Sequence, residues 1–245
     1  MLIFNLKIFI SLFIAILPPA LLVHYMTGKT ESNKKQKRII FTLYLLGIIL
    51  TIPILSLEFL LGRIEASFGF SLLLSQFLKA FLIVGLCEEF SKGIIVYVFA
   101  YKRIEFDQFI DGVVFAITVS MGLATFENLL YLLNGGVGIA LLRTFTAVPM
   151  HAISAGILGY YISRAKFSNS RNDARKFLLK GVFFASIIHG LYDFILSSNP
   201  DLYLYASIGA YLLLILISIV LFNKIKSANN KDIKMRKAEL VSEAI

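Results

Sequence analysis

The stretch SQFLKAFLIVGLCEEFSKGIIVYVFA, residues 75–100, decides the fold. It is long and apolar enough to cross a hydrocarbon core of about 30 Å as a helix. Its interior nevertheless contains Glu88, Glu89 and Lys92. A charged side chain near the centre of a bilayer costs about 2.5–3.5 kcal/mol on insertion scales. The segment therefore predicts a membrane-spanning helix whose charged face packs against other helices rather than against lipid.

The composition of the whole chain agrees with this interpretation. Apolar residues make up 58% of the 245 residues, and the mean hydropathy is +0.81. Soluble domains have about 45–50% apolar residues. The apolar residues come in long blocks, which excludes a disordered chain and a disulfide scaffold. Cys87 is the only cysteine, so no internal disulfide can form. We therefore predict an all-α fold, a polytopic bundle of transmembrane helices.

Seven blocks are long enough to span a membrane. The predicted connections Asn134–Gly138 and Ser197–Leu202 are too short to hold a soluble domain. We expect one integral-membrane domain over residues 1–223, with the motif-bearing core at about 75–197, followed by a basic tail at 224–245. The predicted spans are 2–26, 39–61, 75–100, 108–133, 139–162, 177–197 and 203–223.

The charge pattern predicts how the bundle is oriented. The chain has 24 Lys and Arg against 15 Asp and Glu, a net charge of +9. Most of the cations lie in short runs between apolar blocks, on alternate connections, which is typical of membrane topology rather than of nucleic-acid binding. By the positive-inside rule the C-terminus is cytoplasmic and the N-terminus lies outside. We expect the lipid bilayer as a partner and no nucleic acid.

Polar residues inside the predicted spans point to one buried cluster. Glu88, His151 and His189 each lie 13 or 14 residues from a basic residue on the cytoplasmic flank of the span. At 1.5 Å per residue, all three lie about 20 Å from that flank. The cluster can therefore gather at one depth. Its predicted members are Glu88, Glu89, Lys92, Glu127, Asn128, His151, His189 and Asp193.

Helical spacing predicts the pairings within the cluster. Glu88 and Lys92 are four residues apart and share a face, so they can form an ion pair. Glu89 is turned about 100° away and can point toward another helix. His189 and Asp193 have the same spacing, and the Asp could fix one ring nitrogen while the other stays available for chemistry.

Spacing also makes predictions for polar residues around the cluster. Glu127 and Tyr131 share a face, so the phenol could donate a hydrogen bond to the carboxylate. Four other charged residues lie near the outer ends of spans, and we expect them to lie outside the cluster. We expect Glu58 and Arg63 to form a rim pair, and Lys79 and Arg143 to extend to the outer interface.

Carboxylates, two histidines, an amide and a lysine form a general acid–base set. A glutamate could activate water, while a histidine or Asn128 could stabilise an oxyanion. This predicts peptide hydrolysis by activated water without a nucleophilic side chain.

Three alternatives stay open. The same residue types bind zinc, although an HExxH motif is absent. Buried carboxylates also occur in ion-coupled carriers, although no internal repeat is found. A non-catalytic immunity-type scaffold is the third.

The motif residues resemble the PrsW family of glutamic-type intramembrane proteases and, more distantly, the CAAX-protease and bacteriocin-processing group. The resemblance covers four successive spans, about residues 75–197. The matching segments are Cys87–Lys92 (an EExxK pattern), Phe126–Tyr131 (ENxxY), Pro149-Met150-His151, His189–Asp193 (HxxYD) and Asp111-Gly112.

The resemblance implies a bacterial cell-membrane hydrolase that acts on a membrane-anchored protein, with site-1 cleavage of an anti-sigma factor as the associated activity. It implies that Glu88 or Glu89 is the water-activating base. Glu127, His151 and His189 would hold the water or the oxyanion. We expect no cofactor and no metal. The supporting residues would be Lys92, Asn128, Tyr131 and Asp193.

Overall fold

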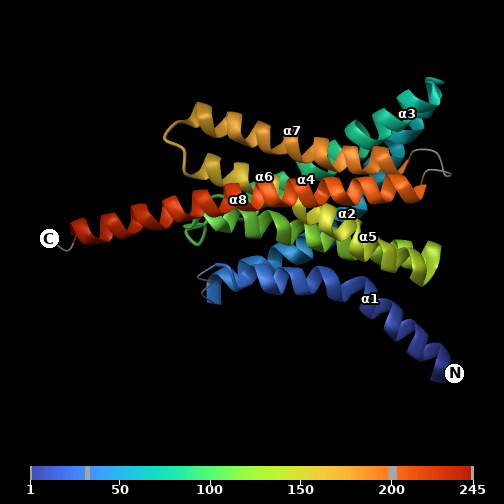
Figure 1. The fold of residues 1–245 in the computed structure, drawn as a ribbon, viewed down its shortest axis with the longest axis horizontal. Helices are drawn as coiled ribbons and strands as arrows, with labels where there is room; N and C mark the ends of the chain where they lie inside the picture. The colour runs from blue at the N-terminus through green and yellow to red at the C-terminus, as the bar shows by residue number, and fades with distance from the viewer. Residues whose placement is uncertain (1, 31–33, 198–202, 244–245) are drawn as a thin grey trace.

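The computed structural model describes residues 2–30, 34–197 and 203–243, and in these residues every regular element is helical. Figure 1 shows long helices running roughly along one axis of the molecule, with α1 and α7 on opposite sides of α5 in this view. The elements are α1 (Leu2–Thr27), α2 (Lys34–Ser67), α3 (Leu72–Leu78), the π-helical segment η1 (Lys79–Gly85), α4 (Leu86–Phe99), α5 (Phe109–Phe145), α6 (Ala147–Lys166), α7 (Arg171–Leu196) and α8 (Tyr203–Glu243).

The structure confirms the predicted fold class, a bundle of helices that includes membrane-spanning candidates. Segments α3, η1 and α4 follow one another without a break and together cover the predicted third span. Among the described residues, four helices are long and apolar enough to cross a membrane by length and composition. The count of seven spans and the orientation of the termini stay predictions. The four helical segments are Lys34–Ser67, Phe109–Phe145, Arg171–Leu196 and Tyr211–Ile233.

Helix α5 is the central element of the bundle. Its most apolar stretch is 94% buried, and every residue from Phe109 to Thr125 is buried. A helix that is apolar on all sides must be covered on all sides. Helices α1, α2 and α6 provide most of that cover. The residues that follow on α5, including Glu127 and Asn128, are thereby fixed in the middle of the protein.

The chain reverses inside α5 at Gly136. This residue has φ +77° and ψ −176°, a conformation outside the helical region that glycine adopts without a steric penalty. An unbroken helix would separate Glu127 and Arg143 by about 24 Å, but their side chains are 2.7 Å apart. The sequence predicted a loop at Asn134–Gly138. The backbone instead stays helical on both sides of a single break, and α6 begins at Ala147 rather than at 139.

Close contact between η1 and α7 positions the second histidine of the cluster. A Cβ atom added to Gly85 would lie 2.9 Å from the Ser186 carbonyl oxygen and 3.1 Å from the Gly190 nitrogen. A Cβ added to Gly190 would lie 2.7 Å from the ring of Phe81. The two backbones can therefore approach only because both positions are glycine. His189, next to Gly190, is held against the start of α4.

Helix α8 joins the predicted last span to the basic tail. It runs continuously through the boundary that the sequence placed between residues 223 and 224. In Figure 1 its C-terminal part extends beyond the rest of the bundle. The predicted connection Ser197–Leu202 lies, apart from Ser197, outside the described residues.

Candidate active site

The centre of the cluster is an ion network around Lys92, whose side chain is fully buried. The Lys92 Nζ atom lies 3.0 Å from Glu88 Oε2 and 2.7 Å from Glu89 Oε1. It also lies 3.3 Å from His151 Nδ1. The predicted pairing of Glu88 with Lys92 is confirmed. One ammonium group therefore balances two buried carboxylates and also contacts an imidazole.

Glu89 points away from Glu88, as its position on the helix predicted, and links three helices. Its Oε1 atom accepts a hydrogen bond from Ser154 Oγ of α6 at 3.0 Å and from Lys92 of its own helix. The same oxygen lies 2.9 Å from His189 Nδ1 of α7. The side chain of Glu89 is fully buried and does not reach the wall of the neighbouring cavity. Its contacts therefore make it an organising residue.

Each histidine has a carboxylate at the ring nitrogen that points away from Glu88. His151 Nε2 lies 2.9 Å from Glu127 Oε2. His189 Nε2 lies 3.4 Å from Asp193 Oδ2, which confirms the predicted pair. The expectation that the other nitrogen of His189 stays available is wrong in this arrangement, because Nδ1 is already paired with Glu89. The packing of α4 against α7 brings His189 Nδ1 and the Glu89 carboxylate together.

Arg143 belongs to the site, although the sequence placed it at the outer interface. Its Nη2 atom pairs with Glu127 Oε2 at 2.7 Å, and its Nε donates to Asn128 Oδ1 at 3.1 Å. The guanidinium lies 3.9 Å from the ring centre of Tyr131. Tyr131 therefore holds the arginine instead of donating the predicted hydrogen bond to Glu127. Asn128 is also engaged by Arg143, and its Nδ2 donates to the Ala15 carbonyl oxygen at 3.4 Å. It does not line the cavity where an oxyanion would lie.

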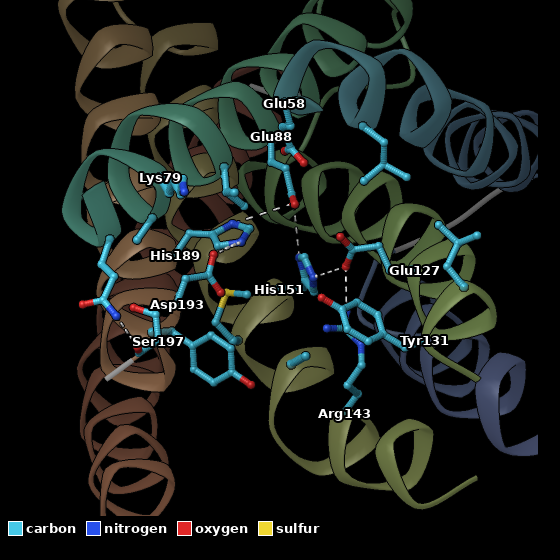
Figure 2. A pocket seen from close by; sticks show the side chains of 18 residues that line it. Glu58, Lys79, Glu88, Glu127, Tyr131, Arg143, His151, His189, Asp193 and Ser197 are labelled. Carbon is cyan, nitrogen blue, oxygen red and sulfur yellow. Dashed lines mark hydrogen bonds and ion pairs between the residues drawn. The ribbon is translucent and has the colours of Figure 1, made fainter. Parts of the chain in front are cut away.

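These side chains meet at a cavity of about 300 Å³ that residues from several helices line. Figure 2 shows Glu88, His151 and His189 converging on it, with Glu127 and Arg143 on the opposite side from His189. The predicted gathering of Glu88, Glu127, His151 and His189 at one place is confirmed. The other polar or charged lining residues are Glu58, Gln76, Lys79, Tyr131, Arg143, Tyr192, Asp193 and Ser197.

Glu58 is a second residue that the sequence did not assign to the site. Instead of forming a rim pair, its side chain lines the cavity, and its Oε1 atom is buried without a hydrogen-bond partner. Lys79 also lines the cavity and pairs with Glu65 at 3.2 Å. The sequence signal for Glu58 was a carboxylate inside an apolar block, the same signal that identified Glu88.

Three residues of the cluster have ligand atoms that lie close enough together to bind one divalent metal ion. One ligand atom from each of Glu88, His151 and His189 lies within 4.8 Å of the others. Glu88 Oε2 is buried, is paired with Lys92 Nζ at 3.0 Å, and lies 3.7 Å from His151 Nδ1 and 3.8 Å from His189 Nδ1. Such separations suit atoms that share one ion at bond lengths of about 2.0–2.2 Å. The ion would have to displace the Lys92 ammonium, which lies 3.0 Å from Glu88 Oε2 and 3.3 Å from His151 Nδ1. Carboxylates on the far ring nitrogens are the usual support for metal-binding histidines.

The fold and site define a helical membrane protein with a buried glutamate–histidine centre. The sequence profile of the "PrsW family intramembrane metalloprotease" matches residues 35–222. The chain belongs to this family, and is therefore a bacterial membrane protease.

Several relatives carry the name Protease PrsW. The one from Halalkalibacterium halodurans is 34% identical over 218 residues, which cover 89% of this chain and 96% of the relative. The one from Shouchella clausii is 35% identical over 211 residues, covering 86% and 94%. The one from Bacillus subtilis is 32% identical over 183 residues, covering 75% and 81%. No solved structure matches the chain significantly.

Proposed function

We propose that the chain cleaves a peptide bond of a membrane-anchored protein at the cavity lined by Glu88, Glu127, His151 and His189. The observation that carries this proposal is the position of Glu88 Oε2. This buried atom is paired with the Lys92 ammonium at 3.0 Å and faces two imidazole nitrogens at 3.7 and 3.8 Å. A water molecule bound there would contact a carboxylate and two histidines at once, which is the arrangement that general-base activation of water requires.

The two adjacent glutamates receive different roles. Glu88 lines the cavity, so it can contact a water molecule or a substrate carbonyl. Glu89 is enclosed by Lys92, Ser154 and His189 and lies outside the cavity wall. We therefore assign the reacting carboxylate to Glu88 and a positioning role to Glu89, a choice that the sequence left open.

The sequence favoured catalysis by carboxylate alone, but the geometry favours the alternative with a metal. In that case Glu88 would hold the ion together with His151 and His189 instead of acting as the general base, and the description of the matching family as metalloproteases supports this assignment. When bound, such a metal would supply an activated water and polarise the scissile carbonyl. Glu127 and Asp193 would accept the Nε2 protons of His151 and His189. Binding of the ion through the two Nδ1 atoms would then replace the contact of His189 with Glu89 and that of His151 with Lys92.

The substrate class follows from the surroundings of the site. The reacting groups lie within a helical membrane bundle, so the target must be a segment that can reach them from the bilayer or its surface. The resemblance to PrsW-type proteases makes site-1 cleavage of a membrane-anchored anti-sigma factor the specific activity that we propose.

The test is cleavage of such an anti-sigma factor by the full chain in liposomes. We compare wild type with Glu88→Gln and with Asp173→Asn, a control at an exposed carboxylate. We expect the wild type and Asp173→Asn to cleave and Glu88→Gln to be inactive. A strong chelator should abolish cleavage, and zinc should restore it.

Three results would contradict parts of the proposal. Cleavage by Glu88→Gln would remove Glu88 from the reaction. Cleavage that persists in chelator but depends on Glu88 would return the mechanism to the carboxylate alone. A folded wild type that leaves the anti-sigma factor intact would reject that substrate.

A further inference from the structure

A second polar cavity lies away from the candidate active site, where α5 begins and α6 ends beside α8. It has a volume of about 610 Å³. Arg164 of α6 and Lys224 and Lys231 of α8 contribute three cations to its lining, against one carboxylate, Asp232. None of these residues takes part in the site described above. The cavity therefore has a net positive charge that the protease centre does not use.

The cationic face of α8 is set by helical spacing. Lys224, Ala228 and Lys231 lie at positions i, i+4 and i+7, so they share one face, and all three line the cavity. Lys226 is two residues from Lys224, points to another face and does not line the cavity. Lys224 and Lys231 are therefore directed into the cavity, while Lys226 faces elsewhere. Lys226 provides a matched control on the same helix.

The anionic and cationic groups in the cavity differ in how they are already engaged. The Asp232 carboxylate accepts a hydrogen bond from the backbone N–H of Phe109 at 3.3 Å, at the start of α5. The guanidinium of Arg164 is held over the Phe177 ring and donates to the Tyr160 hydroxyl at 3.3 Å. For the part of the chain that the structure describes, no ion pair is found for Lys224 or Lys231. The two ammonium groups can therefore contact a ligand.

The cavity lies at a membrane–water boundary. The apolar run of α8 ends at Phe222, two residues before Lys224. Helix α6 ends at Lys166, two residues after Arg164. Aromatic side chains, including Tyr160, form part of the same lining. Basic and aromatic residues together are typical of the level of lipid headgroups.

We propose that this cavity binds the headgroup phosphate of an anionic phospholipid. Lys224, Lys231 and Arg164 would hold the phosphate through charge-assisted hydrogen bonds. The aromatic lining would contact the glycerol and the upper part of the acyl chains. Basic pockets between membrane helices bind anionic headgroups in this way. The bound lipid would fix α8 against α5 and α6.

The test measures lipid retention by the purified full chain in detergent, using native mass spectrometry. The probes are dioleoyl phosphatidylglycerol and dioleoyl phosphatidylcholine, which have the same acyl chains, and inorganic phosphate as competitor. We compare wild type, Lys224→Gln/Lys231→Gln, Arg164→Gln and the control Lys226→Gln. We expect wild type and Lys226→Gln to retain phosphatidylglycerol preferentially. Each cation removed from the cavity should weaken retention about fivefold.

Three outcomes would overturn the proposal. Equal retention of the two lipids by wild type would show that the headgroup charge is not recognised. An equal loss in Lys226→Gln would indicate diffuse attraction to the whole basic helix. Displacement of phosphatidylglycerol by millimolar inorganic phosphate would assign the cavity to a soluble anion instead. Thermal unfolding of each variant without added lipid checks that the fold is unchanged.

Discussion

At the scale of single residues, the buried ammonium of Lys92 determines whether two adjacent glutamates can be tolerated. It lies within 3.0 Å of both carboxylates, and all three side chains are buried. Removing one partner of a buried ion network costs about 3–5 kcal/mol, because a charge is left without compensation. We expect Lys92→Met to lose about this much stability when unfolding is measured in chelator.

The double variant Lys92→Met/Glu89→Gln provides the control for this prediction. It removes one of the two uncompensated carboxylates and should recover part of the lost stability. A Lys92→Met protein as stable as wild type would mean that the ammonium does not balance the pair.

A second prediction at this scale concerns Arg143 and its support of the site. It lines the cavity and contacts Glu127, which in turn contacts His151, so it acts on His151 through one intermediate carboxylate. Loss of such a supporting group typically costs 10–100-fold in activity or metal affinity. We expect Arg143→Ala to lower kcat by about that factor, and Arg143→Lys to recover only part of it because the contact with Asn128 needs the guanidinium Nε. Full activity of Arg143→Ala would contradict this role.

Arg143 and Glu58 also mark the limit of what the sequence could predict about the site. The motif residues Glu88, Glu127, His151 and His189 were identified because charge inside an apolar block is costly and their depths agreed. Arg143 enters the site only because the chain reverses at Gly136, which brings together residues that are 16 positions apart. The face of α2 that carries Glu58 is likewise chosen by packing, which helical spacing alone does not specify.

At the scale of elements, the contact of η1 with α7 is the part of the fold that the sequence did not predict. The spans themselves followed from hydropathy, but a π-helical segment and a glycine-to-glycine contact depend on tertiary packing. We expect Gly85→Ala to push η1 away from α7, because its Cβ would lie 2.9 Å from the Ser186 carbonyl oxygen. Such overpacking costs about 1–3 kcal/mol.

The same shift would move His189 relative to Glu88 and Glu89. Proteolytic activity of Gly85→Ala should therefore fall more than its melting temperature alone explains. Gly62→Ala on α2 is the matched control, because nothing lies within 4 Å of its Cβ position. If Gly85→Ala and Gly62→Ala behave alike in both assays, this contact does not position the histidine.

At the scale of the whole molecule, the distribution of basic residues predicts the orientation in the membrane. The connections 27–38 and 101–107, the region 164–180 around the α6–α7 turn, and the tail after Phe222 carry most of the 24 cations. Loops rich in Lys and Arg stay in the cytoplasm. We expect green fluorescent protein to fluoresce, and alkaline phosphatase to be inactive, when either is fused to the C-terminus.

The reverse result should hold for the turn near Gly136. Alkaline phosphatase inserted there should be active, because this turn lies one span away from Lys102 and Arg103, which precede α5. A reporter next to Lys102 and Arg103 serves as the cytoplasmic control. Active phosphatase at the C-terminus would invert the bundle and place the proposed lipid cavity in the outer leaflet. The position of that cavity relative to the apolar runs would be unchanged, so the orientation and the lipid site can be tested separately.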